Sequence, residues 1–305
     1  MLLLDEKKIR KGKAVGLPYV GSKKKVSKKI VEIIKQNFGA DKTVYDVFGG
    51  GGAITAELMI NGISVVYNDL DKTITNMFNR VLNQDREWIK TLIVSRDEFF
   101  RILAKDTKTL DDELKLLINS FGNNRKSYLY GKKVSNIKYK VAVEILEKED
   151  ILFDYNKTTT YQKAVTLYEE ELGFLDKVER ARVLQQLQRL QQLERLQQLE
   201  NIQPLNNYPN TTNEDYHFFS NVKDSVLYLD PPYENTATGS YKSQIDHKDF
   251  YDWAYEMSKN NTVLLSSYEV SDDRFECVYE FKTARSTLQN GARGSICEKL
   301  FMVKG

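Results

Sequence analysis

The stretch KTVYDVFGGGGAITAELMING, residues 42–62, predicts a β-strand, a glycine turn and a helix in direct succession. The next stretch, ISVVYNDLD (63–71), predicts a second strand that ends in acids, and KTITNMFNRVL (72–82) has the apolar spacing of a helix. Upstream, VSKKIVEIIKQNF (26–38) spaces its apolar residues along one helical face. This strand–helix alternation is typical of a mostly parallel, doubly wound α/β sheet.

The alternation stops at about residue 85 and resumes at about residue 225. Helical stretches such as DELKLLINSF and TLYEEELGFLDKVERARV fill the middle, and strand patterns return at SVLYLDPPY and NTVLLSSYEV. The last two strand patterns, FECVYEFKT and EKLFMVK, resemble an antiparallel pair that closes the sheet. We therefore expect a core of residues 1–84 and 221–305, interrupted by a largely helical inserted region, 85–220.

Length and composition predict a cytosolic globular protein. The chain has 305 residues, 41% of them hydrophobic and 29% charged, and no apolar run is long enough to span a bilayer. The apolar part of MLLLDEKK is too short for a signal peptide. Cys277 and Cys297 form no CxxC pair, and His217 and His247 have no cysteine neighbours, so we expect neither disulfides nor a metal site.

The N-terminal arm, about residues 1–25, and the first helix carry an uneven positive charge. Residues 7–29 contain ten Lys or Arg and no acid, although the net charge of the whole chain is only +2. Such a cluster suits a polyanion, nucleic acid first, and a solvated, partly disordered tail is the alternative.

A leucine hexad repeat lies at 184–201, LQQLQRLQQLERLQQLEN, with leucine at every third position. A period of three drifts by about 60° per step on an α-helix, so leucines in a helix of that length would circle it. The composition favours a helix, and a short stacked repeat is the alternative. We assign the repeat a structural or partner-facing role and no chemistry.

The glycine turn DVFGGGG (46–52) differs from both common phosphate-binding motifs. No Gly-Lys-Ser/Thr follows it, and Ile54 replaces the third glycine of GxGxxG. Asp69 follows Gly49 by 20 residues, at the end of the second predicted strand, where an acid accepts hydrogen bonds from ribose hydroxyls. Asp71 is the alternative, because the strand boundary is uncertain by a couple of residues. These features predict an adenosine-type ligand without a pyrophosphate, which S-adenosylmethionine fits.

VLYLDPPYEN, residues 226–235, predicts a buried strand that ends in Asp230, Pro231, Pro232 and Tyr233. Prolines lack an amide donor and fix φ, so they suit a rigid exit from a sheet. A carboxylate beside a rigid main-chain oxygen can accept both N–H groups of an exocyclic amine that becomes tetrahedral, and a tyrosine can stack on its base. An Asp-Pro turn without chemistry is the alternative.

Together these motifs resemble the Dam-type (D12 class) DNA adenine-N6 methyltransferases, most closely the versions carried by bacteriophages. LPYVGSKKK (17–25) looks like the family's N-terminal cofactor motif, DVFGGGG like motif I, YNDLD like motif II and DPPY like motif IV; LLSSY and EKLF resemble the late motifs. The resemblance covers nearly the whole chain. It implies a Rossmann-like methyltransferase sheet, with an antiparallel last strand and an inserted target-recognition region, in an enzyme that methylates adenine N6 in double-stranded DNA from S-adenosyl-L-methionine.

The resemblance also implies the site residues. Asp230, Pro231, Pro232 and Tyr233 would be catalytic, with transfer direct from sulfonium to nitrogen after the base is flipped out of the duplex. The implied cofactor contacts are Tyr19, Lys23, Asp46, Phe48, Gly49, Gly51, Asp69 and Asp230. Tyr19 stands where many members have tryptophan. The predicted DNA contacts are Lys24 and Lys28 in the basic segment and Asn123, Asn124, Arg125, Lys126, Tyr128 and Lys132 in FGNNRKSYLYGKK (121–133).

That last stretch matches the Dam pattern only loosely, so a GATC target does not follow. Cytosine-C5 methylation is disfavoured, because neither cysteine lies in a Pro-Cys loop after a strand. Cytosine N4, RNA adenine and protein glutamine are alternative acceptors, and a non-enzymatic DNA-binding or assembly protein is a further alternative. We expect double-stranded DNA as partner, no membrane, a monomer or weak dimer, and the cytosol of a bacterium or phage-infected host.

Overall fold

A computed structural model describes residues 1–171, 185, 188–205, 208–234, 245–285 and 297–305. It divides into two compact units. The first, the sheet unit, comprises 1–17, 21–78 and 205–305, and the second, the helical unit, comprises 18–20 and 79–204. The stretch 205–220, which we expected in the inserted region, belongs to the sheet unit.

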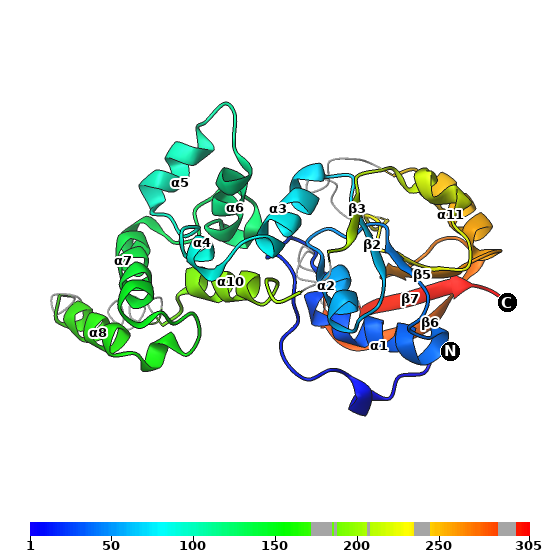
Figure 1. Ribbon diagram of the computed structural model, residues 1–305, viewed down its shortest axis with the longest axis horizontal. Helices are drawn as coiled ribbons and strands as arrows, with labels where there is room; N and C mark the ends of the chain where they lie inside the picture. The colour runs from blue at the N-terminus through cyan, green and yellow to red at the C-terminus, as the bar shows by residue number, and fades with distance from the viewer. Residues whose placement is uncertain (172–184, 186–187, 206–207, 235–244, 286–296) are drawn as a thin grey trace. The chain divides into compact units, whose positions relative to one another are not determined.

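The sheet unit contains a seven-stranded sheet in the order β3-β2-β1-β4-β5-β7-β6 (Figure 1). The strands are β1 (Val44–Asp46), β2 (Val65–Asn68), β3 (Asn210–Thr212), β4 (Val226–Leu229), β5 (Thr262–Ser267), β6 (Phe275–Arg285) and β7 (Cys297–Val303). Pairing is parallel from β3 to β5, and β7 is antiparallel to both of its neighbours. The predicted α/β class and the antiparallel end of the sheet are therefore confirmed. Strand β3 was missed, because its three polar residues, NTT, give no strand signal.

Helices cover both faces of this sheet. On one side lie α1 (Ser27–Phe38) and α2 (Ala53–Ile60), and on the other lie α11 (His247–Ser258) and the 3₁₀ helix η6 (Tyr216–Asn221) (Figure 1). Leu227 and Leu229 of β4 pack with the α11 side of the core. Because side chains alternate along a strand, Tyr228 and Asp230 point to the opposite face.

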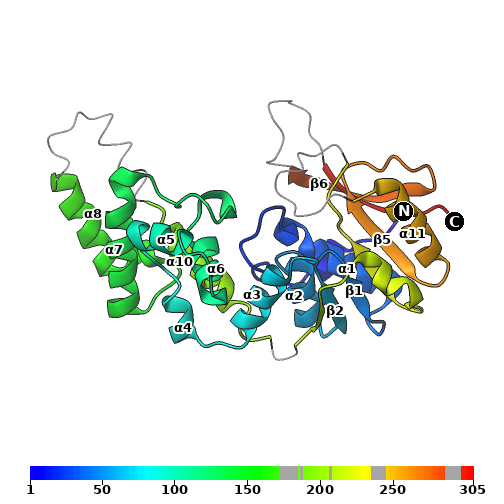
Figure 2. The same cartoon turned by 90° about the horizontal axis from the view of Figure 1, so that it is seen from above.

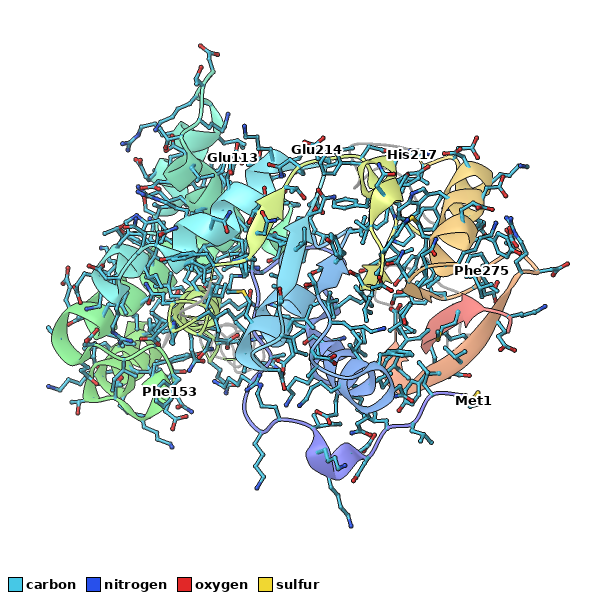
Figure 3. All side chains as sticks on the ribbon, turned by 45° about the vertical axis from the view of Figure 1, so that its right-hand side comes forward. Met1, Glu113, Phe153, Glu214, His217 and Phe275 are labelled. Carbon is cyan, nitrogen blue, oxygen red and sulfur yellow. The ribbon has the colours of Figure 1, made fainter. Side chains whose placement is uncertain are left out.

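The N-terminal arm is docked on the sheet unit. Leu2 N–H donates to Val278 O of β6, so the chain starts beside this strand (Figure 3). Short 3₁₀ helices lie at η1 (Glu6–Lys8) and η2 (Lys23–Lys25). Arg10 donates from Nε and Nη2 to the buried Glu57 of α2, both at 2.8 Å. The alternative of a disordered tail is therefore wrong for these residues.

The helical unit is built from α4 (Arg86–Lys90), α5 (Arg96–Leu103), α6 (Leu110–Ile118), α7 (Lys132–Glu149), α8 (Thr159–Glu171) and α10 (Gln191–Glu200), with 3₁₀ turns η3 (Phe121–Asn123) and η4 (Tyr155–Lys157) (Figure 2). Helix α3 (Lys72–Leu82) runs from the sheet unit into this unit. Side-chain caps begin several helices; Thr109 and Asp112, for example, form a capping box on α6.

The described part of the leucine hexad repeat forms the core helix α10. Leu193, Leu196 and Leu199 are all buried, because three leucines at this spacing diverge by only about 120° over a short helix. Leu184 and Leu187 lie outside the described residues. Gln192 and Arg195 of this helix, together with Asn119 and Tyr128 from earlier in the chain, form the group that we call the amide network. Gln192 Nε2 donates to Asn119 Oδ1, and Arg195 Nη1 donates to the carbonyls of Ile118 and Ser120 at 2.6 and 2.7 Å.

Candidate functional site

The DPPY segment leaves the sheet directly after the fully buried strand β4. Asp230 is 14% exposed, and its Oδ1 lies 2.7 Å from the ammonium of Lys23 in η2. The same ammonium lies 4.8 Å from the ring centroid of Tyr233. Pro231 is buried, and Pro232 and Tyr233 are half-buried. The structure therefore brings together the predicted DPPY residues and the lysine of the N-terminal motif.

The glycine turn lies beside the ends of β1 and β2. Gly49 N–H donates to Asn68 O at 2.8 Å, and Gly50 N–H donates to Asp69 Oδ2 at 2.8 Å. The hydroxyl of Tyr67 donates to Gly50 O at 2.6 Å. These bonds fix the turn against the second strand and place Asp69 at its edge.

At two positions of this turn, close packing leaves no room for a side chain. A Cβ on Gly49 would lie 2.5 Å from Cε2 of Tyr67, and one on Gly52 would lie 2.7 Å from the ring of Phe78. Gly52 also has φ +69°, a left-handed conformation that favours glycine. The core therefore requires glycine at positions 49 and 52, whether or not a ligand approaches the turn.

Asp46 ends β1 and caps the helix that follows the turn. Its Oδ2 accepts from Thr55 N–H at 3.1 Å and from Thr55 Oγ1 at 2.6 Å. Its Oδ1 is buried and has no hydrogen-bond partner among the described residues. Such a group is an expected place for a ligand atom or a water.

The two candidate ribose acids, Asp69 and Asp71, make different contacts. Asp69 Oδ1 accepts from Asp71 N–H at 2.8 Å while Oδ2 holds the glycine turn. Asp71 instead accepts from Thr73 N–H at the start of α3. The side chain of Asp71 therefore serves the helix, and that of Asp69 faces the turn.

Two other predicted cofactor residues, Phe48 and Tyr19, belong to different units of the structure. Phe48 packs its ring against Tyr216 and Phe250, with centroids 6.2 and 5.7 Å apart, and is half-buried. Tyr19 is also half-buried and belongs to the helical unit.

Three carboxylates follow adjacent parallel strands and so meet at one edge of the sheet. Asp46 ends β1, Asp69 follows β2 and Asp230 follows β4. Chain connections diverge between β1 and β4, which makes this the topological switch point where α/β sheets bind ligands. With Glu298 of β7, described next, these residues form the group that we call the acid edge.

Glu298 is a site residue that our sequence prediction missed. It is 5% exposed, and its Oε1 accepts from the Tyr233 hydroxyl at 2.5 Å and from Ser266 Oγ at 2.8 Å. Its Oε2 lies 3.8 Å from the Lys23 ammonium. The segment EKLF carries this glutamate, but its contacts depend on the pairing of β7 with β5, which no local pattern specifies.

Burial shifts the pKa of two acids at this edge, Asp46 and Asp230. Burial raises the pKa of Asp46 to about 7; the charges of Asp230 and Asp69 add to the rise, and the bonds from Thr55 oppose it. Burial likewise raises the pKa of Asp230 to about 6, against the effect of Lys23 and with that of Glu298. Strongly perturbed acids in one place are typical of functional sites.

Two predicted DNA contacts, Lys24 and Lys28, have intramolecular partners. The Lys24 ammonium donates to Gly16 O at 3.3 Å, and that of Lys28 donates to the carbonyls of Arg10 and Gly12 at 3.2 and 2.8 Å. In the structure these lysines therefore contact the N-terminal arm, which charge counting along the sequence does not reveal, and their contact with DNA stays a prediction.

The predicted recognition segment forms a tight loop in the helical unit. Ser120 and Tyr128 pair as an antiparallel bridge, and Phe121 N–H donates to Ser127 O at 2.7 Å. Tyr128 is buried, and its hydroxyl donates to Val94 O at 2.9 Å. Its prediction as a DNA contact is corrected, because the side chain is part of the core.

Other predicted contacts are at the surface of this loop. Asn124, Lys126 and Lys132 are exposed, and Asn123 and Arg125 are half-buried. The Arg125 guanidinium lies 3.1 Å from Glu113, and Asn124 Oδ1 accepts from the N–H groups of Lys126 and Ser127. Phe121, which we did not predict, is 66% exposed on the same loop.

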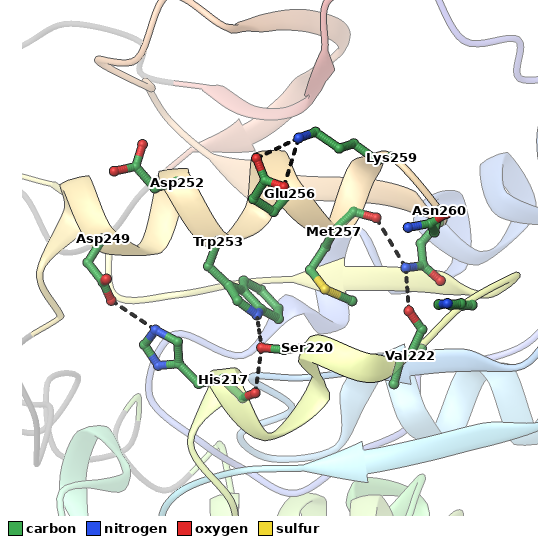
Figure 4. Close-up of a pocket in the computed structure, with 12 residues that line it drawn as sticks. His217, Ser220, Val222, Asp249, Asp252, Trp253, Glu256, Met257, Lys259 and Asn260 are labelled. Carbon is green, nitrogen blue, oxygen red and sulfur yellow. Dashed lines mark hydrogen bonds and ion pairs between the residues drawn. The ribbon is translucent and has the colours of Figure 1, made fainter.

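A separate hollow of about 460 Å³ lies between η6 and α11 (Figure 4). His217 and Asp249 meet at one end, 3.1 Å apart, and Trp253 and Met257 form its floor. None of the predicted catalytic or cofactor residues lines it. The described hollow is therefore distinct from the acid edge.

Within the described ranges, His, Cys, Asp and Glu form no group of three or more that could hold a metal ion. No described helix is both long enough and apolar enough to cross a membrane.

The family model described as D12 class N6 adenine-specific DNA methyltransferase matches residues 19–281 of the chain, which include the DPPY segment, the glycine turn and the loop of residues 121–133. No curated protein matches the chain.

Proposed function

The chain belongs to the D12 class N6 adenine-specific DNA methyltransferase family, and we propose that Asp230, Pro231 and Tyr233 bind the target adenine after it is flipped from the duplex. The activity class follows from the family: an S-adenosylmethionine-dependent enzyme that methylates adenine N6 in DNA. The proposal adds the roles of individual residues.

The observation that carries this proposal is the acid edge at the switch point of the sheet. Parallel strands lie about 4.8 Å apart, so the loops after β1 and β4 are neighbours. The first loop is the glycine turn, and the second is DPPY. A ligand held by the first would therefore face the acceptor residues of the second.

The residues at this edge fit the cofactor. The bound group supplies a methyl carbon made electrophilic by a positively charged sulfur. A cation suits a site with three carboxylates, Asp46, Asp69 and Asp230, and Asp46 Oδ1 has spare acceptor capacity within the described chain. We assign the ribose hydroxyls to Asp69. The further proposed contacts are Tyr19, Lys23, Phe48, Gly49 and Gly51.

The acceptor residues supply hydrogen bonding and orientation. The amine of adenine is a weak nucleophile, because its lone pair is delocalised into the ring. Asp230 accepts one N–H, and the carbonyl of Pro231, held by Pro232, accepts the other; both bonds strengthen as the nitrogen becomes tetrahedral. Tyr233 stacks on the base, which contributes about 1–3 kcal/mol. Since Lys23 lies over one face of the ring, we expect the base on the other.

We propose that the sheet unit is the catalytic core and that the helical unit recognises the target. The exposed Lys126 and Lys132 suit phosphates, and Asn123, Asn124 and Arg125 suit base edges. The exposed ring of Phe121 suits an apolar contact between bases. These contacts offset the few kcal/mol that unstacking an adenine costs.

The test is methylation of host DNA by the expressed protein, measured by mass spectrometry of the digested nucleosides. Wild type should produce N6-methyladenine. Asp230→Ala should lose at least about 100-fold of the rate, while DNA binding in a gel-shift assay largely survives. Asp273→Ala, at an exposed carboxylate of the same unit, is the matched control.

Two outcomes would contradict the proposal. N4-methylcytosine in place of N6-methyladenine would identify another acceptor. Full activity of Asp230→Ala would remove Asp230 from the reaction.

A further inference from the structure

Glu298 is a buried acid whose hydrogen bonds all go to the acceptor site or to the strand beside it. One oxygen accepts from the hydroxyls of Tyr233 and Ser266, at 2.5 and 2.8 Å. The side chain is 7% exposed. Burial of a carboxylate is unfavourable unless hydrogen bonds or a cation compensate for lost water. Here the compensation comes from Tyr233 and Lys23, which both contact or flank Asp230.

The other oxygen of Glu298 faces the counter-ion of Asp230. Lys23 Nζ lies 2.7 Å from Asp230 Oδ1 and 3.8 Å from Glu298 Oε2, so one ammonium lies between two carboxylates. A carboxylate that shares its oxygens with a lysine has fewer left for an incoming amine. A second anion beside Lys23 provides the ammonium with another partner when the amine binds.

Tyr233 gains its orientation from the same glutamate. The residue follows two prolines, which restrict its backbone, and its hydroxyl, at the far end of the ring, donates to Glu298 and also lies within hydrogen-bonding reach of Asp230. A ring fixed at both ends loses little further freedom when a base stacks on it. Misplacement of a reacting group by about 1 Å can reduce a rate about 100-fold, so such fixing has kinetic value.

We propose that Glu298 is a positioning residue for methyl transfer: it fixes the ring of Tyr233 through the hydroxyl and gives Lys23 a second anionic contact, which leaves Asp230 free to accept the target amine. This inference rests on the proposed role of DPPY. It assigns Glu298 no contact with the cofactor or with the reacting atoms.

Charge around Asp230 gives the proposal a second readout. The titratable groups that face this carboxylate are Lys23, Glu298, Tyr233, Tyr228 and Asp46. Burial is the main reason that the pKa of Asp230 is raised, and the charge of Glu298 adds to the rise. Removal of that charge should therefore lower the pKa of Asp230 and move the acidic limb of the kcat profile to lower pH. Loss of a purely structural contact would leave the acidic limb of the kcat profile at the same pH.

The experiment uses Glu298→Gln, Tyr233→Phe and their combination in the full-length chain, with unmethylated genomic DNA as substrate. Glu298→Gln should lower kcat about 10- to 100-fold and leave the KM for DNA within about twofold. Tyr233→Phe removes the hydroxyl and keeps the ring, so it should reproduce part of this loss. If both act through one hydrogen bond, the double variant should be no slower than Glu298→Gln. Glu276→Gln, an exposed glutamate on β6, is the control.

A measurement without turnover completes the test. Carboxyl ¹³C NMR of the protein without cofactor should place the Asp230 titration at lower pH in Glu298→Gln than in wild type. The proposal is overturned if Glu298→Gln keeps kcat within twofold of wild type and leaves the Asp230 titration unchanged. It is also overturned if the losses of kcat caused by Glu298→Gln and Tyr233→Phe multiply in the double variant. If Glu298→Gln fails to fold, an unchanged kcat in Tyr233→Phe overturns it. A wild type that methylates no adenine would contradict the proposed function instead.

Discussion

The acid edge of the sheet unit and the amide network of the helical unit solve the burial of polar groups in opposite ways. In the amide network, neutral and cationic donors meet acceptors: Arg195 donates to backbone carbonyls, and Gln192 Nε2 donates to Asn119 and Val94, while the neutral Gln192 Oε1 has no partner in the described chain. In the acid edge, carboxylates crowd together, and Asp46 Oδ1 has no partner in the described chain. The first arrangement stabilises a fold, whereas the second stores unfavourable charge that a ligand can relieve.

The first test of this comparison is a substitution of Arg195 in the amide network. Arg195→Met should lower the free energy of unfolding by about 2–4 kcal/mol, because it removes the side-chain donor to the carbonyl of Ile118 and the shorter of two hydrogen bonds to that of Ser120. Urea denaturation measures this loss. We expect cofactor affinity, by calorimetry, to be unchanged at temperatures where the variant is folded.

The repeat itself supplies the control. Arg189 occupies the same position in the preceding hexad, but its side chain is 65% exposed and pairs with Glu194. Arg189→Met should cost less than about 1 kcal/mol, as exposed ion pairs do. Equal losses of unfolding free energy at the two positions would show that the buried hydrogen bonds of Arg195 stabilise the fold no more than the exposed ion pair of Arg189 does.

The second test concerns the acid edge, where the substitution should raise stability at high pH and not lower it. The pKa of Asp46 is raised above its unfolded value, so its contribution to stability is fully present below pH 3.8 and is lost as pH rises through about 7. Wild type should therefore become less stable from pH 5 to pH 8. Asp46→Asn should remove about 2 kcal/mol of that fall, since one pKa unit is worth about 1.4 kcal/mol.

Thermal unfolding at both pH values measures this effect. Asparagine can still accept from Thr55, so the cap of α2 should survive. Asp273→Asn, at an exposed carboxylate, should leave the slope unchanged. If Asp46→Asn has the wild-type slope, the acid edge does not store charge in the way argued here.

The sequence carried enough information for the sheet but not for the contacts across it. The strands that end at or just before Asp46, Asp69 and Asp230 were predicted from short apolar runs, because each run is followed by glycine, proline or acid. Strand β3 lacks that pattern. Glu298 depends on antiparallel pairing with β5, and the burial of Tyr128 depends on Val94, 34 residues away in the chain. Such long-range contacts leave no local periodicity.

The basic segments show the same limit and provide the last and smallest test. Lys126 and Lys28 are both lysines in positively charged stretches, but Lys126 is exposed and Lys28 donates to two carbonyls of the arm. Each phosphate contact contributes a slope of about −0.9 to log K against log salt. Lys126→Gln should therefore make the salt dependence of DNA binding shallower by about that amount and weaken binding a few-fold. Lys28→Gln should leave the slope unchanged and lower the melting temperature slightly. A shallower slope for Lys28→Gln would mean that the arm releases this lysine to the DNA, and that the sheet unit shares phosphate binding with the helical unit.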